Sequence, residues 1–253
     1  MQLQDKVALI TGAGSGIGAA VARRFVEDGA KICIVGRREN KLVETAEGLP
    51  SDKVKIFPGD INKDEDIEKM VEATVQWGGK IDALVNCAGI NVEGGVVNVD
   101  LDDWNRILRT NFLAPFMLMR ATIPHMIKKN KGSIINIASI GGLRCLQERV
   151  GYCTSKAALI MLTKQAAVDY GQYNIRCNAV CPGFVLTEMT KAHFGEAPAN
   201  VFRNMPLRRG AEPHEISGIC SYLASDDSGY MTGSVITIDA GNTVVDAFEA
   251  SMK

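Results

Sequence analysis

The stretch VGYCTSKAAL, residues 150–159, places a tyrosine and a lysine four positions apart. Residues at i and i+4 share one face of a helix, so Tyr152 and Lys156 can point into the same space. A free phenol has a pKa of about 10 and is a poor base near neutral pH, but a nearby ammonium favours the phenolate and lowers that pKa. The pair could therefore exchange a proton with an alcohol or ketone oxygen, an effect worth roughly 10²–10⁴-fold in rate.

A tyrosine and a lysine at this spacing occur in many sequences by chance, but three further signals accompany the pair here. Ser139 ends the apolar stretch GSIINIAS, 13 residues before Tyr152, and CPG at 181–183 ends another such stretch. Ligands bind at the carboxyl edge of open α/β sheets, so both signals belong near Tyr152 if these stretches are parallel strands. Asn111 lies within a helical pattern, where asparagine is unfavourable unless its side chain has a task such as holding a water against the backbone.

A glycine-rich motif, TGAGSGIG at 11–18, directly follows the first apolar stretch and opens a helical pattern. Glycines at this spacing permit a tight turn and close approach of a pyrophosphate to the backbone, and the helix N-terminus supplies free N–H groups. The motif predicts a dinucleotide site that includes Gly12, Ser15, Gly16, Ile17 and Gly18. The alternative is a glycine-rich connector that binds nothing.

The sequence CIVGRREN at the end of the second apolar stretch bears on the choice of dinucleotide. NAD-selective proteins usually carry an acid here for the ribose 2′-hydroxyl, whereas arginine accommodates a 2′-phosphate. This chain has Gly36 followed by Arg37 and Arg38, and a guanidinium can bind phosphate through two parallel hydrogen bonds. NADP(H) is therefore favoured over NAD(H), although both arginines could instead be solvated residues that enter the next helix.

The elements that position these residues alternate along the chain. Short apolar runs predict strands buried on both faces, at Val7–Thr11, Lys31–Val35, Val54–Phe57, Ala83–Cys87, Ser133–Ile137, Arg176–Cys181 and Val235–Asp239. Helical periodicity lies between them, at Ile17–Asp28, Glu39–Leu49, Asp64–Trp77, Leu101–Lys128, Tyr152–Tyr170 and Pro213–Leu223. This alternation predicts an α/β fold with a doubly wound parallel sheet in a single domain, residues 1–253.

Local signals refine one of these helices and the starts of two others. Pro115 and Pro124 should bend or end the helix predicted at 101–128. Asn62 followed by Glu65 resembles a capping box, and Pro213 suits a first helical position.

Composition excludes several classes of partner. The chain has 253 residues, 46% of them hydrophobic, and 28 Lys plus Arg balance 29 Asp plus Glu, so no broad basic field points to nucleic acid or an anionic membrane. No stretch approaches the roughly 20 apolar residues of a membrane span. The seven cysteines form neither a CxxC pair nor a zinc-like cluster. We therefore expect reduced thiols, no metal, a cytoplasmic location and a small-molecule partner.

Taken together, these motifs resemble the short-chain dehydrogenase/reductase family over nearly the whole chain. The matching pieces are TGAGSGIG (11–18), GDI (59–61), NCAG (86–89), Asn111, Ser139, YCTSK (152–156), NAVCPGFVLT (178–187) and DAG (239–241). Cys87 stands where the family commonly has a second asparagine, and the tail after DAG, at 242–253, is longer than in many relatives. We expect that tail to be a surface segment rather than a part of a neighbouring subunit's pocket.

The resemblance implies a Rossmann-type seven-stranded sheet, usually a homotetramer, and specific roles. Tyr152 would be the general acid/base, Lys156 would lower its pKa and bind the nicotinamide ribose, Ser139 would orient the substrate oxygen, and Asn111 would hold a water in a proton relay. Further cofactor contacts would come from Asp60, Ile61, Asn86, Ala88, Gly89, Pro182, Gly183, Val185 and Thr187.

Substrate identity depends on two less defined segments. Residues 184–205 correspond to the family's substrate lid and carry Phe184, Leu186, Met189, Phe194, Val201, Phe202 and Met205, which favour an apolar or cyclic ketone unless they only pack the lid onto the sheet. Arg144, Cys145, Gln147, Glu148 and Arg149 should border the pocket. The two arginines would be solvated or would meet an anionic group of the substrate, and Cys153 should point into the helix packing.

The sequence leaves three functions open. The first is an NADP(H)-dependent oxidoreductase that interconverts a secondary alcohol and a ketone, of class EC 1.1.1.-. The second is a 3-oxoacyl-thioester reductase acting on acyl carrier protein. The third is a non-catalytic nucleotide-sensing protein, against which the complete Asn111, Ser139, Tyr152 and Lys156 set argues.

Overall fold

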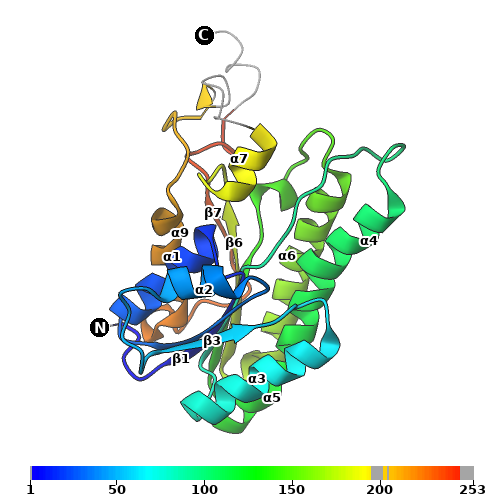
Figure 1. Cartoon of the computed structure of the whole chain (residues 1–253). Helices are drawn as coiled ribbons and strands as arrows, with labels where there is room; N and C mark the ends of the chain where they lie inside the picture. The colour runs from blue at the N-terminus through cyan, green and yellow to red at the C-terminus, as the bar shows by residue number, and fades with distance from the viewer. Residues whose placement is uncertain (1, 195–201, 204, 246–253) are drawn as a thin grey trace.

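A single parallel sheet organises the chain in the computed structural model, which describes residues 2–194, 202–203 and 205–245 (Figure 1). Its strand order is β3-β2-β1-β4-β5-β6-β7. The strands are β1 Val7–Thr11, β2 Lys31–Gly36, β3 Val54–Pro58, β4 Ala83–Asn86, β5 Gly132–Ile137, β6 Ile175–Pro182 and β7 Val235–Ile238. Each predicted strand is present to within one residue at either end, and the doubly wound seven-stranded sheet is confirmed.

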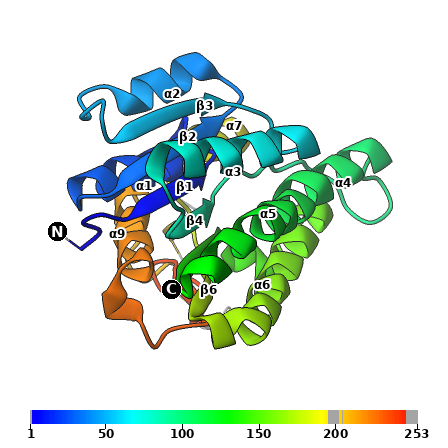
Figure 2. The same ribbon diagram turned by 90° about the horizontal axis from the view of Figure 1, so that it is seen from below.

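Helices cover both faces of this sheet (Figure 2). One layer packs α1 Gly16–Glu27, α2 Glu39–Ala46 and α9 Pro213–Ala224. The other packs α3 Asp64–Gly78, α5 Ala114–Lys129 and α6 Val150–Tyr170, with α4 Leu101–Leu108 against α6. The short helix α7, Glu188–Phe194, lies beyond the carboxyl ends of the strands. Among the described residues, none of the helices combines the length and apolarity needed to cross a bilayer.

The strand side chains divide between the two layers because successive residues of a strand point to opposite faces. Ala8 and Ile10 of β1 join the core under α1 and α9, while Leu9 between them joins the core under α3 and α5. The expectation of burial on both faces holds for the inner strands. It is wrong for β3 and β7, whose residues are mostly half-buried, because these two strands form the edges of the sheet.

The helix predicted at 101–128 is divided by a π-helical segment, Arg109–Leu113, between α4 and α5. Ala114 N–H donates to the carbonyl of Arg109, five residues earlier, and Pro115 follows directly. Pro115 has no N–H for the carbonyl four residues before it, which accounts for the local change of register. Pro124 lies inside α5 without ending it.

Some predicted helix boundaries agree with the structure and others do not. Pro213 occupies the first position of α9, as expected, with a capping box made by Glu212 and Glu215. The box predicted at Asn62 and Glu65 is wrong, because α3 begins at Asp64 and the Asn62 side chain instead accepts a hydrogen bond from the Thr110 hydroxyl at 3.1 Å. The second helix, α2, ends at Ala46, three residues earlier than predicted, and Gly48 follows with a φ of +77°.

Candidate active site and cofactor cleft

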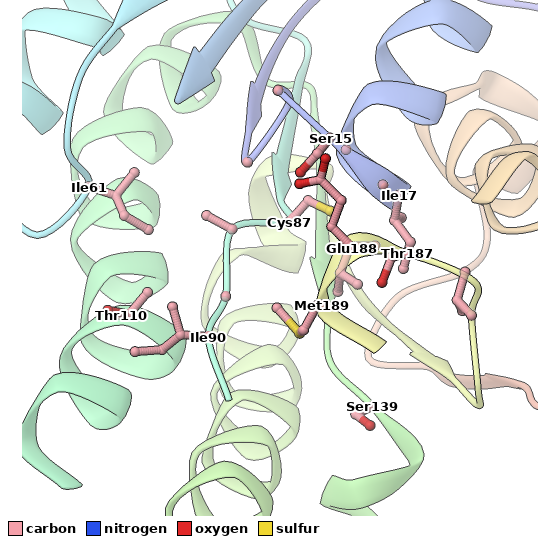
Figure 3. Close-up of a pocket in the computed structure, with 18 of the residues that line it drawn as sticks. Ser15, Ile17, Ile61, Cys87, Ile90, Thr110, Ser139, Thr187, Glu188 and Met189 are labelled. Atoms are coloured by element: carbon pink, nitrogen blue, oxygen red, sulfur yellow. The ribbon is translucent and has the colours of Figure 1, made fainter. Parts of the chain in front are cut away.

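A cleft of about 360 Å³ lies at the carboxyl ends of the strands (Figure 3). The cleft lies beside β1, which pairs with β2 on one side and with β4 on the other. At this point the order of the strands in the sheet changes direction. Crevices at such a switch point bind ligands in open α/β sheets. The lining is contributed by the glycine-rich loop, the ends of β2, β4, β5 and β6, and helices α6 and α7.

The glycine-rich loop is packed too tightly for larger residues. A Cβ at Gly12 would lie 2.7 Å from Ala88 Cα, and one at Gly18 would lie 2.3 Å from the Gly12 carbonyl oxygen. These contacts bring the start of α1 directly under the cleft, where its first N–H groups have no partners within the helix. Backbone donors at a helix N-terminus suit a pyrophosphate, so the loop fits a dinucleotide.

Three cationic side chains line the cleft beyond the end of β2. Arg37 and Arg38 are exposed, and Lys41 follows them on α2, where its ammonium lies 2.7 Å from a Glu44 carboxylate oxygen. Arg38 pairs with Glu188 of α7 at 3.5 Å. The end of the cleft nearest β2 therefore carries positive charge suited to an anionic group of a nucleotide.

Ser139 and Tyr152 meet at the opposite part of the same cleft. Ser139 begins the turn after β5, where its hydroxyl accepts a hydrogen bond from the Gly141 N–H at 3.0 Å. A Cβ placed on Gly141 would lie 3.2 Å from the Tyr152 ring and 3.4 Å from the Ser139 hydroxyl oxygen. The Ser139 side chain and the Tyr152 ring therefore lie side by side at Gly141.

Lys156 lies buried behind this pair. Its ammonium donates to the Ile137 carbonyl at 2.8 Å and lies 5.8 Å from the centre of the Tyr152 ring. Burial lowers the pKa of Lys156 from 10.5 to about 8.

The electrostatics of Tyr152 differ from the sequence-based expectation. Burial raises the pKa of the Tyr152 phenol, and a hydrogen bond with Ser139 only partly offsets this rise. The expected lowering by Lys156 is therefore not found in the protein alone, because burial disfavours charge on both groups.

The Asn111 side chain makes contacts that the sequence did not predict. Its amide clamps the backbone of Ile90, accepting from the N–H at 2.8 Å and donating to the carbonyl at 2.9 Å. It also donates to the Ser155 hydroxyl at 3.1 Å, and that hydroxyl donates to the Tyr152 carbonyl at 2.8 Å. The Asn111 side chain thereby ties the loop after β4 to the helix that carries Tyr152 and Lys156.

The cleft gathers most of the predicted site residues. Its lining includes Gly12, Ser15, Gly16, Ile17, Gly18, Arg37, Arg38, Asp60, Ile61, Ala88, Gly89, Ser139, Tyr152, Lys156, Pro182, Gly183, Val185 and Thr187. Two predicted residues lie outside the lining. One is Asn111, and the other is Asn86, which is buried in β4 and whose side-chain amide donates to Asn136 at 2.8 Å.

Sequence reasoning missed several residues that line the cleft. One of them is Lys41, which follows Arg37 by four positions. In a helix this spacing places two side chains on one face, so it could have linked the two cations. Glu188 and Met189 directly follow the predicted contact Thr187, and Thr110 precedes Asn111. Neighbours of a motif were the available signal. Ile90 likewise directly follows Gly89, the last residue of NCAG.

In the segment before α6, Arg149 differs from the expectation of a solvated charge, while Arg144 agrees with it. Arg149 is buried and pairs with Glu93 at 2.6 Å, whereas Arg144 is exposed and donates to the Asn242 carbonyl at 2.8 Å. The Cys153 thiol accepts a hydrogen bond from the Leu146 N–H at 3.4 Å, so it faces this segment rather than the helix packing.

All seven cysteines are free thiols, and no group of three or more metal-ligating side chains occurs in the described part of the chain. Of the predicted tail, the structure describes residues 242–245, and the remainder lies outside the described residues.

Comparison with known proteins identifies the family. Residues 12–243 match the family model described as enoyl-(acyl carrier protein) reductase. The chain is 40% identical to the 3-oxoacyl-[acyl-carrier-protein] reductase FabG of Thermotoga maritima, covering 95% of this chain and 99% of that protein. It is 39% identical to the trans-4-hydroxycyclohexanecarboxylate dehydrogenase of Sinomonas cyclohexanicum, covering 96% and 94%. A short-chain type dehydrogenase/reductase from Mycobacterium marinum has a similar structure, with a TM-score of 0.90, 35% identity and coverage of 96% and 97%. The chain belongs to the short-chain dehydrogenase/reductase family of oxidoreductases.

Proposed function

We propose that the protein interconverts a secondary alcohol and a ketone and prefers NADP(H) to NAD(H). One observation carries this proposal. A single cleft contains the glycine-rich loop, the Arg37–Arg38 pair, and the Ser139, Tyr152 and Lys156 side chains. Gly36 stands where an acid would repel a 2′-phosphate, and the two arginines that follow can bind that phosphate, so this stretch supports NADP(H).

The geometry supports general acid/base catalysis at the substrate oxygen. When bound, the nicotinamide dinucleotide exchanges a hydride with the substrate carbon. In reduction the Tyr152 hydroxyl gives its proton to the carbonyl oxygen, and in oxidation the Tyr152 phenolate receives the proton of the alcohol, while Ser139 donates a hydrogen bond to the same oxygen. The buried Lys156 ammonium stabilises the phenolate that remains.

The substrate we propose is apolar or cyclic, and residues 184–205 form its lid. Within the described residues, Phe184 contacts Phe202 edge to face, with ring centres 5.3 Å apart, and Met189 is partly exposed beside the cleft. An apolar cover of this kind suits a ketone with little polarity besides its oxygen. The similarity to a dehydrogenase of a hydroxycyclohexane carboxylate supports the cyclic class. Val201 and the Phe194 side chain lie outside the described residues.

A panel of cyclic, acyclic and acyl-thioester ketones, each assayed by NADPH and NADH absorbance, tests the proposal. We expect turnover of cyclic ketones, with NADPH the better cofactor. Turnover of 3-oxoacyl thioesters alone would favour the second candidate, a 3-oxoacyl-thioester reductase, which the 40% identity to such an enzyme supports. Binding of both cofactors without turnover of any ketone would instead indicate a nucleotide-sensing protein.

We further propose a cytoplasmic homotetramer. The family resemblance supports the assembly, and seven free cysteines fit a reducing compartment. Light scattering coupled to size-exclusion chromatography measures the mass of the assembly. A monomeric mass would contradict the proposed homotetramer.

A further inference from the structure

An ion pair spans the cofactor cleft between two elements far apart in the sequence. Arg38 follows β2, and Glu188 begins α7, yet the Arg38 Nη2 and Glu188 Oε2 atoms lie 3.5 Å apart. Both residues line the cleft. The pair is exposed, so its contribution to folding is small, and a ligand can compete for either partner.

Glu188 is held at this place by the contact of its neighbour with the glycine-rich loop. A Cβ at Gly16 would lie 3.1 Å from the Thr187 methyl group, so the residue before Glu188 rests on the loop at the start of α1. In Figure 3, the Glu188 side chain extends from α7 toward this loop, where Ser15 is labelled. A carboxylate therefore lies in the part of the cleft that is otherwise suited to phosphate.

The Glu188 carboxylate should affect the binding of NADP(H) more than the binding of NAD(H). A 2′-phosphate bound by Arg37 and Arg38 must draw Arg38 away from Glu188, and it experiences the repulsion of a nearby negative charge. A dinucleotide without that phosphate leaves the pair intact. Lys41 replaces the lost cation only in part, because it is already paired with Glu44 at 2.7 Å.

We propose that Glu188 is a cofactor-selectivity residue that competes with the 2′-phosphate for Arg38 and so reduces the preference for NADP(H) over NAD(H). This inference rests on the proposed function, because it takes the arginines to be the 2′-phosphate site. The usual acid that selects NAD lies at the end of the second strand, where this chain has Gly36. Here the acid comes from α7, across the cleft.

Calorimetric titration with 2′,5′-ADP and with ADP isolates the 2′-phosphate from the rest of the cofactor. We expect Glu188→Gln to tighten 2′,5′-ADP binding by about three- to fivefold, the size typical of exposed charge pairs, and to leave ADP binding nearly unchanged. The gain should shrink at high salt. In an Arg38→Gln background, Glu188→Gln should give no gain. Glu39→Gln, which removes an exposed carboxylate outside the cleft lining, serves as the matched control.

The same titrations also give results that would overturn the role of Glu188, and they separate that role from the proposed NADP(H) preference. Equal tightening of both nucleotides, or a gain that survives in the Arg38→Gln background, contradicts competition for Arg38. If the wild type prefers 2′,5′-ADP and Glu188→Gln does not increase that preference, the NADP(H) proposal stands and the role of Glu188 is rejected. If the wild type shows no preference but Glu188→Gln creates one, the NADP(H) preference fails and the role of Glu188 is supported.

Discussion

The guanidinium of Arg149 lies 2.6 Å from the carboxylate of Glu93, and this pair joins two segments that border the active site. Arg149 is buried and directly precedes α6, the helix of Tyr152 and Lys156. The backbone reinforces the junction, because Gly94 N–H donates to the Glu148 carbonyl at 2.9 Å and Val150 N–H donates to the Gly94 carbonyl at 3.1 Å. The loop after β4 thus fixes the position at which α6 begins.

Loss of this pair should reduce turnover without weakening cofactor binding. Glu93→Gln leaves the buried Arg149 without its anionic partner and loosens the start of α6, so we expect kcat to fall roughly tenfold through misplacement of Tyr152. The dissociation constant for NADPH should be unchanged. Glu148→Gln removes the neighbouring exposed carboxylate and should behave like the wild type. Equal losses in both variants would contradict a specific role of Glu93.

Replacement of the acid/base phenol gives a sharper loss. Tyr152→Phe keeps the ring, so the variant should bind NADPH like the wild type, but it removes the proton that exchanges with the substrate oxygen. We expect turnover to fall by about 10²–10⁴-fold. Steady-state assays with the best ketone of the panel, together with fluorescence titration of NADPH, measure both quantities. Unchanged turnover would remove Tyr152 from the catalytic machinery.

The buried ammonium of Lys156 predicts a pH-dependent stability. Its pKa is lowered by burial from 10.5 to about 8, so between these values the unfolded chain holds a proton that the folded protein has released. The contribution of Lys156 to the free energy of unfolding therefore rises as pH increases through this window. The wild type should gain on the order of 3 kcal/mol relative to Lys156→Met across it. Urea unfolding of both proteins at several pH values measures this difference, and parallel pH profiles would contradict it.

Much of this site was predictable because its parts are local in the sequence. The glycine-rich loop follows β1 and opens α1, so strand pattern, glycine spacing and helix start coincide within residues 7–27. Ser139 and Tyr152 could be assigned to one edge of the sheet because parallel strands bring their carboxyl ends together. The strand boundaries followed from short apolar runs closed by Gly, Pro, Asp or Asn.

The features that sequence reasoning missed depend on contacts between distant segments. Asn111 is engaged by Ile90 and Ser155, and Glu188 meets Arg38 only because α7 lies over the cleft. The burial that raises the pKa of Tyr152 could not be seen from the spacing of Tyr152 and Lys156, which shows only their charges. The paired Glu93 and Arg149 lie 56 residues apart, with no shared pattern to connect them.

The arginines after β2 make a direct prediction about cofactor choice. Arg37 lines the cleft and is exposed, so its guanidinium is available to a 2′-phosphate. Arg37→Ala should raise the KM for NADPH about tenfold or more, since hydrogen bonds to charged groups contribute roughly 1.5–3 kcal/mol, and it should change the KM for NADH much less. Arg23→Ala, at an exposed arginine on α1 outside this cleft, is the matched control. Equal effects on both cofactors would show that Arg37 does not contact the phosphate.

The π-helical segment before α5 makes the last prediction, because its register depends on a missing hydrogen-bond donor. Pro115 cannot donate to the Asn111 carbonyl, and the turn at Arg109–Leu113 widens around Asn111. Pro115→Ala supplies that donor, so an ordinary α-helical turn becomes available and the Asn111 amide shifts relative to Ile90 and Ser155. We expect kcat to fall about tenfold with little loss of thermal stability. Pro124→Ala, which restores a donor inside α5 and away from Asn111, should leave kcat unchanged. A similar loss of kcat in both variants would show that the π-helical turn has no specific role in catalysis.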